Sequence, residues 1–236
     1  MRNRESHDAV RSLTPLARHY LDAVLDSDRH GATALVQDAV ENGASVRDIY
    51  MTVFQPVQQL LGLLWQKSEI SVAQEHFSTA VTQLNMSLLY SHIFTSEKNG
   101  RHLVATCVGG ELHEIGVRMV ADFFEMEGWD TYYLGANAPA ESVVETVQRV
   151  GADILAVSTS MTYNIPEVIA LIEKAKAADI NPELRVLVGG RPFNTDKELW
   201  RRVGADLYAP DAQTAINVVN EALDERSAGG THERGR

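Results

Sequence analysis

The stretch Gly109-Gly110-Glu111-Leu112-His113-Glu114-Ile115-Gly116 decides how the second half of this chain is expected to fold. It follows the apolar run Leu103-Val104-Ala105-Thr106-Cys107-Val108, which predicts a strand buried on both faces. An amphipathic helical pattern comes after it, with apolar residues at 117, 120, 121 and 124. The stretch is therefore predicted to be a strand-to-helix loop at the carboxyl end of a strand, where open α/β sheets bind ligands.

The loop contains one candidate metal ligand, His113, with Glu111 two residues before it. A carboxylate that holds the other ring nitrogen of a histidine is a common support for metal binding. A solvated loop histidine with no ligand role is the competing interpretation of this pair.

Two further motifs are predicted at the same edge of the sheet. Ser158-Thr159-Ser160 follows Gly116 after 41 intervening residues, at the end of the apolar run 154–157. Gly189-Gly190 begins after a further 28 residues, at the end of the strand-like run 184–188. The carboxyl ends of parallel strands share one edge, so the three motifs are expected to line one crevice.

These motifs and their spacing resemble the cobalamin-binding domain family. The resemblance implies that His113 binds cobalt from the lower face of the corrin and that the benzimidazole tail is buried beside Ser158, passing Gly189 and Gly190. The capping of a turn by Ser158 is the competing interpretation for that residue. The cofactor-contacting residues implied in this half of the chain are Glu111, His113, Glu114, Ile115, Gly116, Ser158, Ser160, Gly189 and Gly190.

The first half of the chain is predicted to be a four-helix bundle cap. Its helices are expected over 14–26, 28–41, 45–65 and 71–95, with Pro56 bending the third, and with capping residues at Thr14, Ser45 and Ser71. The polar segment 96–100 separates the bundle from the rest of the chain. The predicted organisation is a disordered N-terminus over 1–13, the bundle over 14–97, a cobalamin-binding domain over 98–225 and a disordered tail over 226–236.

Strands and helices alternate in the second half, which predicts a parallel sheet covered by helices on both faces. Five strands and the lack of a Gly-x-Gly-x-x-Gly motif favour a flavodoxin-like, Rossmann-related order. The strands are expected at 102–108, 129–134, 153–158, 184–188 and 206–209, and the helices at 114–127, 139–150, 164–178, 195–203 and 211–224.

Composition narrows the functional classes. The 236 residues include 21 Lys plus Arg and 32 Asp plus Glu, so the formal net charge is −11, which argues against direct nucleic-acid binding. One cysteine, Cys107, rules out a disulfide framework within the chain. The N-terminus lacks the apolar core of a signal peptide, and a cytoplasmic location without membrane contact is expected.

A second resemblance lies at the end of the third helix. Trp65 and the pair Glu75-His76, ten residues on, resemble the segment of adenosylcobalamin-dependent photoreceptors in which a bundle caps the upper face of the corrin. The resemblance implies that Trp65 packs on the adenosyl group and that Glu75 hydrogen-bonds to it. Glu111 also resembles this photoreceptor subgroup, which has glutamate two residues before the histidine, whereas methyl carriers usually have aspartate there. A core tryptophan and a first-turn carboxylate are the competing interpretations.

The leading hypothesis from this resemblance is a light sensor that binds adenosylcobalamin base-off, performs no turnover chemistry and signals by conformational or oligomeric change. Gln66 stands where repressor-type sensors have a histidine, and no winged-helix DNA-binding domain is expected before the bundle. The light signal is then expected to be passed on through homo-oligomerisation, or through a transcription-factor or signalling partner. Biliverdin as a second chromophore is a further alternative, for which the strand residue Cys107 is a poor attachment point.

Two hypotheses of other classes stay open. The chain could be a methyl-carrying corrinoid protein that serves a separate methyltransferase, or a cobalamin-dependent antirepressor. Preferential binding of methylcobalamin would favour the carrier, whereas the Trp65 and Glu75 pair favours the sensor.

Overall fold

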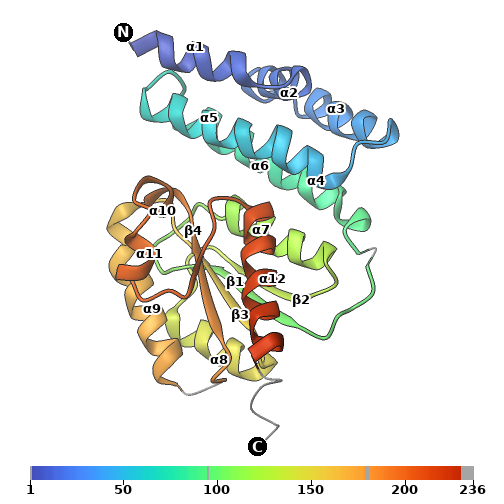
Figure 1. Cartoon of the computed structure of the whole chain (residues 1–236). Helices are drawn as coiled ribbons and strands as arrows, with labels where there is room; N and C mark the ends of the chain where they lie inside the picture. Colours follow the sequence, from blue (N-terminus) through green and yellow to red (C-terminus); the bar gives the residue numbers. More distant parts are fainter. Residues whose placement is uncertain (1, 95, 179–180, 230–236) are drawn as a thin grey trace, which may run out of the picture. The chain divides into compact units, whose positions relative to one another are not determined.

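The computed structural model describes residues 2–94, 96–178 and 181–229. The chain divides into two compact units, Met1–Ile93 and Phe94–Arg236 (Figure 1). Among the described residues, no helix combines the length and apolar character needed to cross a membrane.

The first unit is helical, as its apolar periodicity predicted. Tyr20, Phe54 and Leu61 lie fully buried in its core. The predicted caps at Thr14, Ser45 and Ser71 are confirmed, because each side chain accepts an N–H from the first turn of its helix, and Ser71 forms a complete capping box with Gln74. The elements are α1 (Arg2–Ser12), α2 (Pro15–Leu25), α3 (Arg29–Glu41), α4 (Val46–Ile49), the π-helix η1 (Tyr50–Phe54), α5 (Gln55–Gln66), α6 (Val72–Leu88) and the 3-10 turn η2 (Tyr90–His92).

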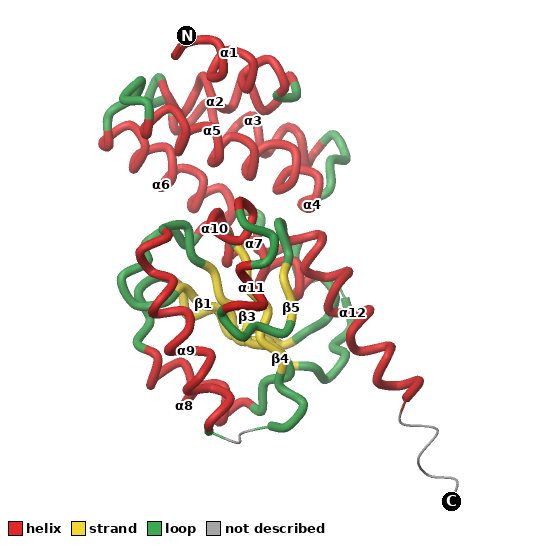
Figure 2. The backbone as a smooth tube through the Cα atoms, turned by 60° about the vertical axis from the view of Figure 1, so that its left-hand side comes forward, coloured by secondary structure: helices red, strands yellow, loops and turns green. Residues whose placement is uncertain are grey.

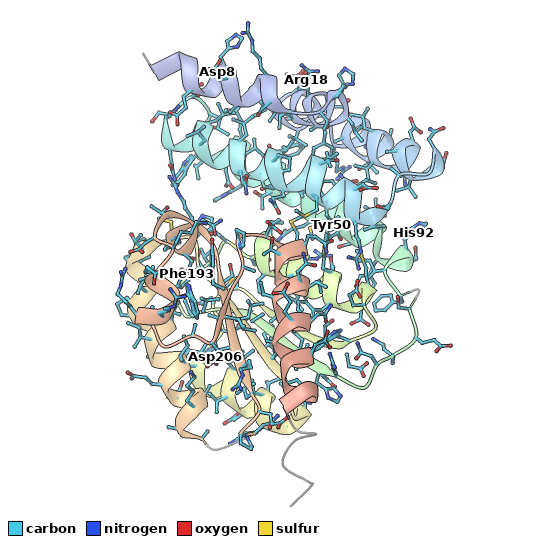
Figure 3. The ribbon with its side chains drawn as sticks, viewed as in Figure 1. Asp8, Arg18, Tyr50, His92, Phe193 and Asp206 are labelled. Atoms are coloured by element: carbon cyan, nitrogen blue, oxygen red, sulfur yellow. The ribbon has the colours of Figure 1, made fainter. Side chains whose placement is uncertain are left out.

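The predicted interruption at Pro56 is confirmed and takes the form of a π-helical turn over Tyr50–Phe54 (Tyr50 is labelled in Figure 3). Proline has no N–H to donate to the carbonyl four residues earlier, which belongs to Thr52. The hydroxyl of Thr14, the cap of α2, lies 3.4 Å from that carbonyl oxygen and donates to it. One side chain therefore caps α2 and satisfies the backbone that Pro56 leaves open.

Two expectations for the first unit were wrong. Residues 2–12 form α1 rather than a disordered segment, because polar contacts hold it: the Ser6 hydroxyl donates to Glu69 at 2.8 Å, and Lys67 pairs with Glu5 at 2.7 Å. Helix α6 ends at Leu88 instead of continuing toward residue 95, and the 3-10 turn Tyr90–His92 follows it. Thr95, the expected end of that helix, lies outside the described residues.

The second unit confirms the flavodoxin-like class. Its five strands are all parallel, in the order β2-β1-β3-β4-β5. Helices α7 and α12 cover one face of the sheet, and α8 and α9 cover the other (Figure 2). The strands are β1 (His102–Cys107), β2 (Asp130–Gly135), β3 (Ile154–Ser158), β4 (Arg185–Gly189) and β5 (Leu207–Tyr208); the helices are α7 (Ile115–Met126), α8 (Ala140–Val150), the 3-10 turn η3 (Thr162–Asn164), α9 (Ile165–Ala177), α10 (Arg191–Thr195), α11 (Leu199–Arg202) and α12 (Ala212–Gly229).

Two boundaries in the second unit differ from expectation. The helix expected over 195–203 is instead the short pair α10 and α11, because Asp196 takes an extended backbone and accepts the N–H of Glu198 at 3.1 Å. Phe193 on α10 is fully buried (Figure 3). Helix α12 continues to Gly229, so the tail expected from residue 226 begins as helix, and residues 230–236 lie outside the described part.

Candidate functional site

The three predicted motifs meet at the carboxyl edge of the sheet. Strands β1 and β3 are neighbours, and Ser158 at the end of β3 is in register with Cys107 on β1 and Gly189 on β4. The strand that follows β1 in the chain, β2, lies on one side of the β1–β3 pair, and the strand that follows β3, β4, lies on the other side. The loops after β1 and β3 therefore flank the point at which the strand order reverses.

Glu111 connects the loop after β1 to the loop after β3. Its side chain is fully buried. One carboxylate oxygen, Oε2, accepts the Thr159 hydroxyl and the Ser160 N–H, both at 2.8 Å. The Met161 N–H and the Asn164 side-chain amide also donate to it, both at 3.1 Å. A buried carboxylate with this many donors is stable as the anion.

The other oxygen of Glu111 holds His113. Oε1 accepts the His113 backbone N–H at 3.0 Å and lies 2.5 Å from Nδ1 of its ring. Burial alone would raise the pKa of Glu111, but the hydrogen bonds from His113, Ser160 and Thr159 outweigh burial and hold that pKa well below its usual range.

His113 is the exposed member of this pair. Half of its side-chain surface is accessible to solvent, whereas that of Glu111 is not accessible at all. Because Glu111 engages Nδ1, a metal on this histidine would be bound by Nε2. The geometry is therefore that of a single outward-facing imidazole with a buried orienting carboxylate.

A second set of contacts joins the His113 loop to the loop after β2. The Gly110 N–H donates to the Asn137 side chain at 2.8 Å, and the Asn137 N–H donates to the Glu111 carbonyl at 2.9 Å. Gly110 and Asn137 both have positive φ, 79° and 54°, a conformation that glycine and asparagine tolerate best. The loop is thus fixed on both sides.

The glycine pair at the end of β4, Gly189-Gly190, serves the packing of these loops. At Gly190, with φ 105°, an added Cβ would lie 2.0 Å from the backbone oxygen of Thr159; at Gly189 it would lie 3.0 Å from the Ala209 oxygen. Gly109 and Gly116 instead face open space, with no atom within 4 Å of an added Cβ. Close backbone approach therefore explains Gly189 and Gly190 without a ligand.

The remaining predicted residues of the second unit lie nearby in different roles. Ser158 is the last residue of β3, Ser160 contributes its N–H to Glu111, and Ile115 begins α7. Glu114 turns its carboxylate toward β2, where Tyr133 and the Ala136 N–H donate to it.

The predicted upper-face residues all belong to the first unit. Trp65 is partly exposed at the end of α5, and Glu75 and His76 lie in the first turn of α6. Glu75 accepts the Thr79 hydroxyl at 3.0 Å, and its other oxygen lies 2.6 Å from Nδ1 of His76. Both residues are accordingly engaged with each other on the bundle.

Sequence reasoning missed the residues that complete the site: Thr159, Asn164, Asn137 and Tyr133. Thr159 lies between two serines that were predicted, and the position just past a strand end is a signal that could have singled it out. Asn164 is buried and reaches Glu111 from η3, a contact for which the sequence carries no local pattern.

The donor set at this edge fits only a metal that brings most of its own ligands. Within the described ranges no group of three or more His, Cys, Asp or Glu side chains could hold a bare ion. A cobalt ion held by a corrin ring needs only one axial ligand from the protein, and His113 offers one outward-facing imidazole. The residues present therefore fit a corrinoid.

Family comparison agrees with this chemistry. Residues 101–217 match a family model described as a B12 binding domain, and residues 16–90 match a second model with the same description. Both B12-binding domain families are present in this chain. The first model spans the sheet unit with the His113 loop, and the second spans most of the helical unit with Trp65 and Glu75.

The similar proteins are named as corrinoid proteins. A corrinoid protein of Desulfitobacterium hafniense is 27% identical over 85% of this chain and 94% of its own length. Trimethylamine corrinoid protein 1 of Methanosarcina acetivorans is 24% identical over 86% and 94%. The solved monomethylamine corrinoid protein of Methanosarcina barkeri has a TM-score of 0.78 at 22% identity, covering 88% of this chain and 98% of that one, which shows the shared fold.

Proposed function

We propose that this protein is a corrinoid protein that carries a methyl group for a separate methyltransferase. One observation carries the proposal: His113 faces outward with its Nδ1 held by a fully buried Glu111, in a chain with both B12-binding domain families. Relatives named as methylamine corrinoid proteins align over most of their length with this chain, which favours the carrier over the light sensor.

When bound, the corrinoid supplies a cobalt centre that accepts and releases the methyl group. The chain's own residues then have two tasks. His113 would hold the cobalt through its imidazole, and Glu111 orients the ring and stabilises positive charge on it through the bond at Nδ1. The four donors from 159–164 keep Glu111 anionic and hold its carboxylate in place behind the ring.

The test is reconstitution of the full chain with methylcobalamin and with adenosylcobalamin. The wild type is expected to bind methylcobalamin with a base-off absorption spectrum, and His113→Ala is expected to lose at least about 10-fold in affinity, since even the loss of a residue that orients a metal ligand costs that much. Methyl transfer from the loaded protein to a thiol acceptor, with a methyltransferase supplied, would support the carrier. Equal binding by His113→Ala and the wild type would reject His113 as the cobalt ligand.

The second candidate is the adenosylcobalamin light sensor, with or without biliverdin. The specific observation in its favour is the segment from Trp65 to Glu75 and His76, with Trp65 exposed over 39% of its surface at the end of α5. Such a sensor would hold the adenosyl group against Trp65. Homo-oligomerisation and a transcription-factor partner are predictions that belong to this candidate.

Illumination separates the two candidates. The adenosylcobalamin-loaded protein is passed over a size-exclusion column in the dark and after green light, with and without biliverdin. A light-induced change in elution that Trp65→Ala abolishes would favour the sensor, and a red absorption band with biliverdin would identify a second chromophore. Elution that does not respond to light would leave the methyl carrier as the supported function.

A further inference from the structure

The carboxylate of Glu114, the residue after His113, reaches the residues at the end of β2. Glu114 is the N-cap position of α7, yet its side chain caps no helix N–H. Its Oε2 instead accepts the Tyr133 hydroxyl and the Ala136 N–H, both at 2.9 Å. The resemblance implies cofactor contact for Glu114, which stays a prediction, and these bonds give its side chain a task within the protein.

The turn after β2 is shaped around this carboxylate. Gly135 has φ 74°, and a Cβ added there would lie 2.9 Å from Oε2 of Glu114. The glycine lets the backbone pass close enough for the next N–H, that of Ala136, to reach the carboxylate. Tyr133 donates from the edge strand, two residues before the turn.

His113 is therefore held from both neighbouring sides. Glu111 ties the loop to the residues after β3, and Glu114 ties it to the residues after β2. The two carboxylates use different partners, so neither attachment can substitute for the other. A ring that must meet a cobalt at a fixed distance gains from this second attachment, because small displacements weaken an axial bond.

We infer that Tyr133 and Glu114 are positioning residues that set the place of His113 against the corrinoid. The inference rests on the proposed corrinoid binding, in that His113 is the ligand being positioned. The hydroxyl of Tyr133 acts through Glu114 and the backbone of the loop, without touching the cofactor.

Tyr133→Phe removes one hydroxyl and keeps the ring. Tyr132→Phe is the matched control, because Tyr132 is the adjacent tyrosine on the same strand and packs on the opposite core, against α8 and α9. In the unloaded protein, amide hydrogen exchange over 110–115 is expected to rise about 2- to 10-fold in Tyr133→Phe, the effect of one lost hydrogen bond. The Tyr132→Phe control is expected to leave exchange in this segment unchanged.

The loaded protein supplies a second readout. With cobalt in its divalent state, the electron paramagnetic resonance spectrum shows splitting by an axial nitrogen when His113 is bound. Tyr133→Phe and Glu114→Ala are expected to reduce the fraction with this splitting, whereas Glu114→Gln, which keeps an acceptor oxygen, is expected to retain it. Circular dichroism confirms that each variant is folded.

The outcomes distinguish the inference from the proposed function. If the wild type shows no axial nitrogen splitting, corrinoid binding through His113 is rejected, and faster loop exchange in Tyr133→Phe still shows that Tyr133 holds the loop. If the wild type shows the splitting and Tyr133→Phe matches it in both exchange and splitting, the positioning role is overturned while the proposed function stands.

Discussion

At the level of single residues, the two oxygens of Glu111 have separate partners. Oε1 faces His113 and Oε2 faces the donors from 159–164. A glutamine here would have to direct an N–H group at one of these sets of donors. We therefore expect Glu111→Gln to lower the free energy of unfolding by about 2 to 4 kcal/mol, since it disrupts a buried charged network.

Urea denaturation of the unloaded protein measures this effect. The matched control is Glu141→Gln, because Glu141 pairs with Lys174 at the surface, where solvent screening leaves such pairs little effect on stability. Equal stabilities for the two variants would show that the network around Glu111 is not a stabilising one.

Cys107 is the single thiol of the chain and is fully buried on β1. Burial, followed by the negative charges of Glu111 and Glu114, raises the pKa of this thiol far above its usual range. A thiol reagent such as dithionitrobenzoate is therefore expected to leave the native protein unmodified at pH 8 and to react once in urea. Ser91→Cys, at an exposed position, is the positive control.

The same pKa shift predicts the direction of a pH effect. The native state keeps Cys107 protonated while the unfolded chain ionises above about pH 8.5, so unfolding is favoured as pH rises. Tyr133 acts in the same sense, because burial and its bond to Glu114 raise its pKa. The free energy of unfolding is expected to fall between pH 8 and pH 10, as measured in urea; a rise over this range would contradict these assignments.

At the level of elements, the glycines of the site divide into two kinds. Gly190 lies in a positive-φ turn pressed against the Thr159 backbone, whereas Gly116 lies in the first turn of α7 beside open space. Gly190→Ala is expected to destabilise the unloaded protein by at least about 1 to 3 kcal/mol from backbone strain. Gly116→Ala is expected to stabilise it by about 0.5 to 1 kcal/mol, because alanine favours helix.

Thermal unfolding of the two alanine variants compares these effects directly. Opposite shifts of Tm relative to the wild type are expected. A loss of stability in both variants would contradict the prediction for Gly116 and would mean that the fold needs glycine at this position as well.

At the level of the whole molecule, every contact of the His113 loop described above lies within the second unit. The partners come from β2, β3 and the loops that follow them, and the unit has its own core. A fragment over 96–229 is therefore expected to fold alone and to bind cobalamin. Absorption titration of the fragment and its His113→Ala variant checks this, and a fragment that folds but binds equally with and without His113 would contradict it.

The sequence by itself determined the fold class, because a flavodoxin-like parallel sheet follows from the alternation of apolar runs and amphipathic stretches, which are local properties. The same holds for the helix caps at Thr14, Ser45 and Ser71 and for the interruption at Pro56, where the signal and its effect lie within a few residues. The strand-to-helix loop predicted around His113 likewise lies between β1 and α7.

Only the tertiary structure decided what holds that loop. The carboxylates of Glu111 and Glu114 accept hydrogen bonds from residues that lie in other strands and turns of the chain: Asn164, Thr159 and Tyr133. No local sequence pattern predicts these contacts. Helix α1 is a similar case, because its order depends on Ser6 and Glu5 meeting residues more than sixty positions away. Contacts between distant residues depend on how the elements pack, and that packing is a property of the folded chain.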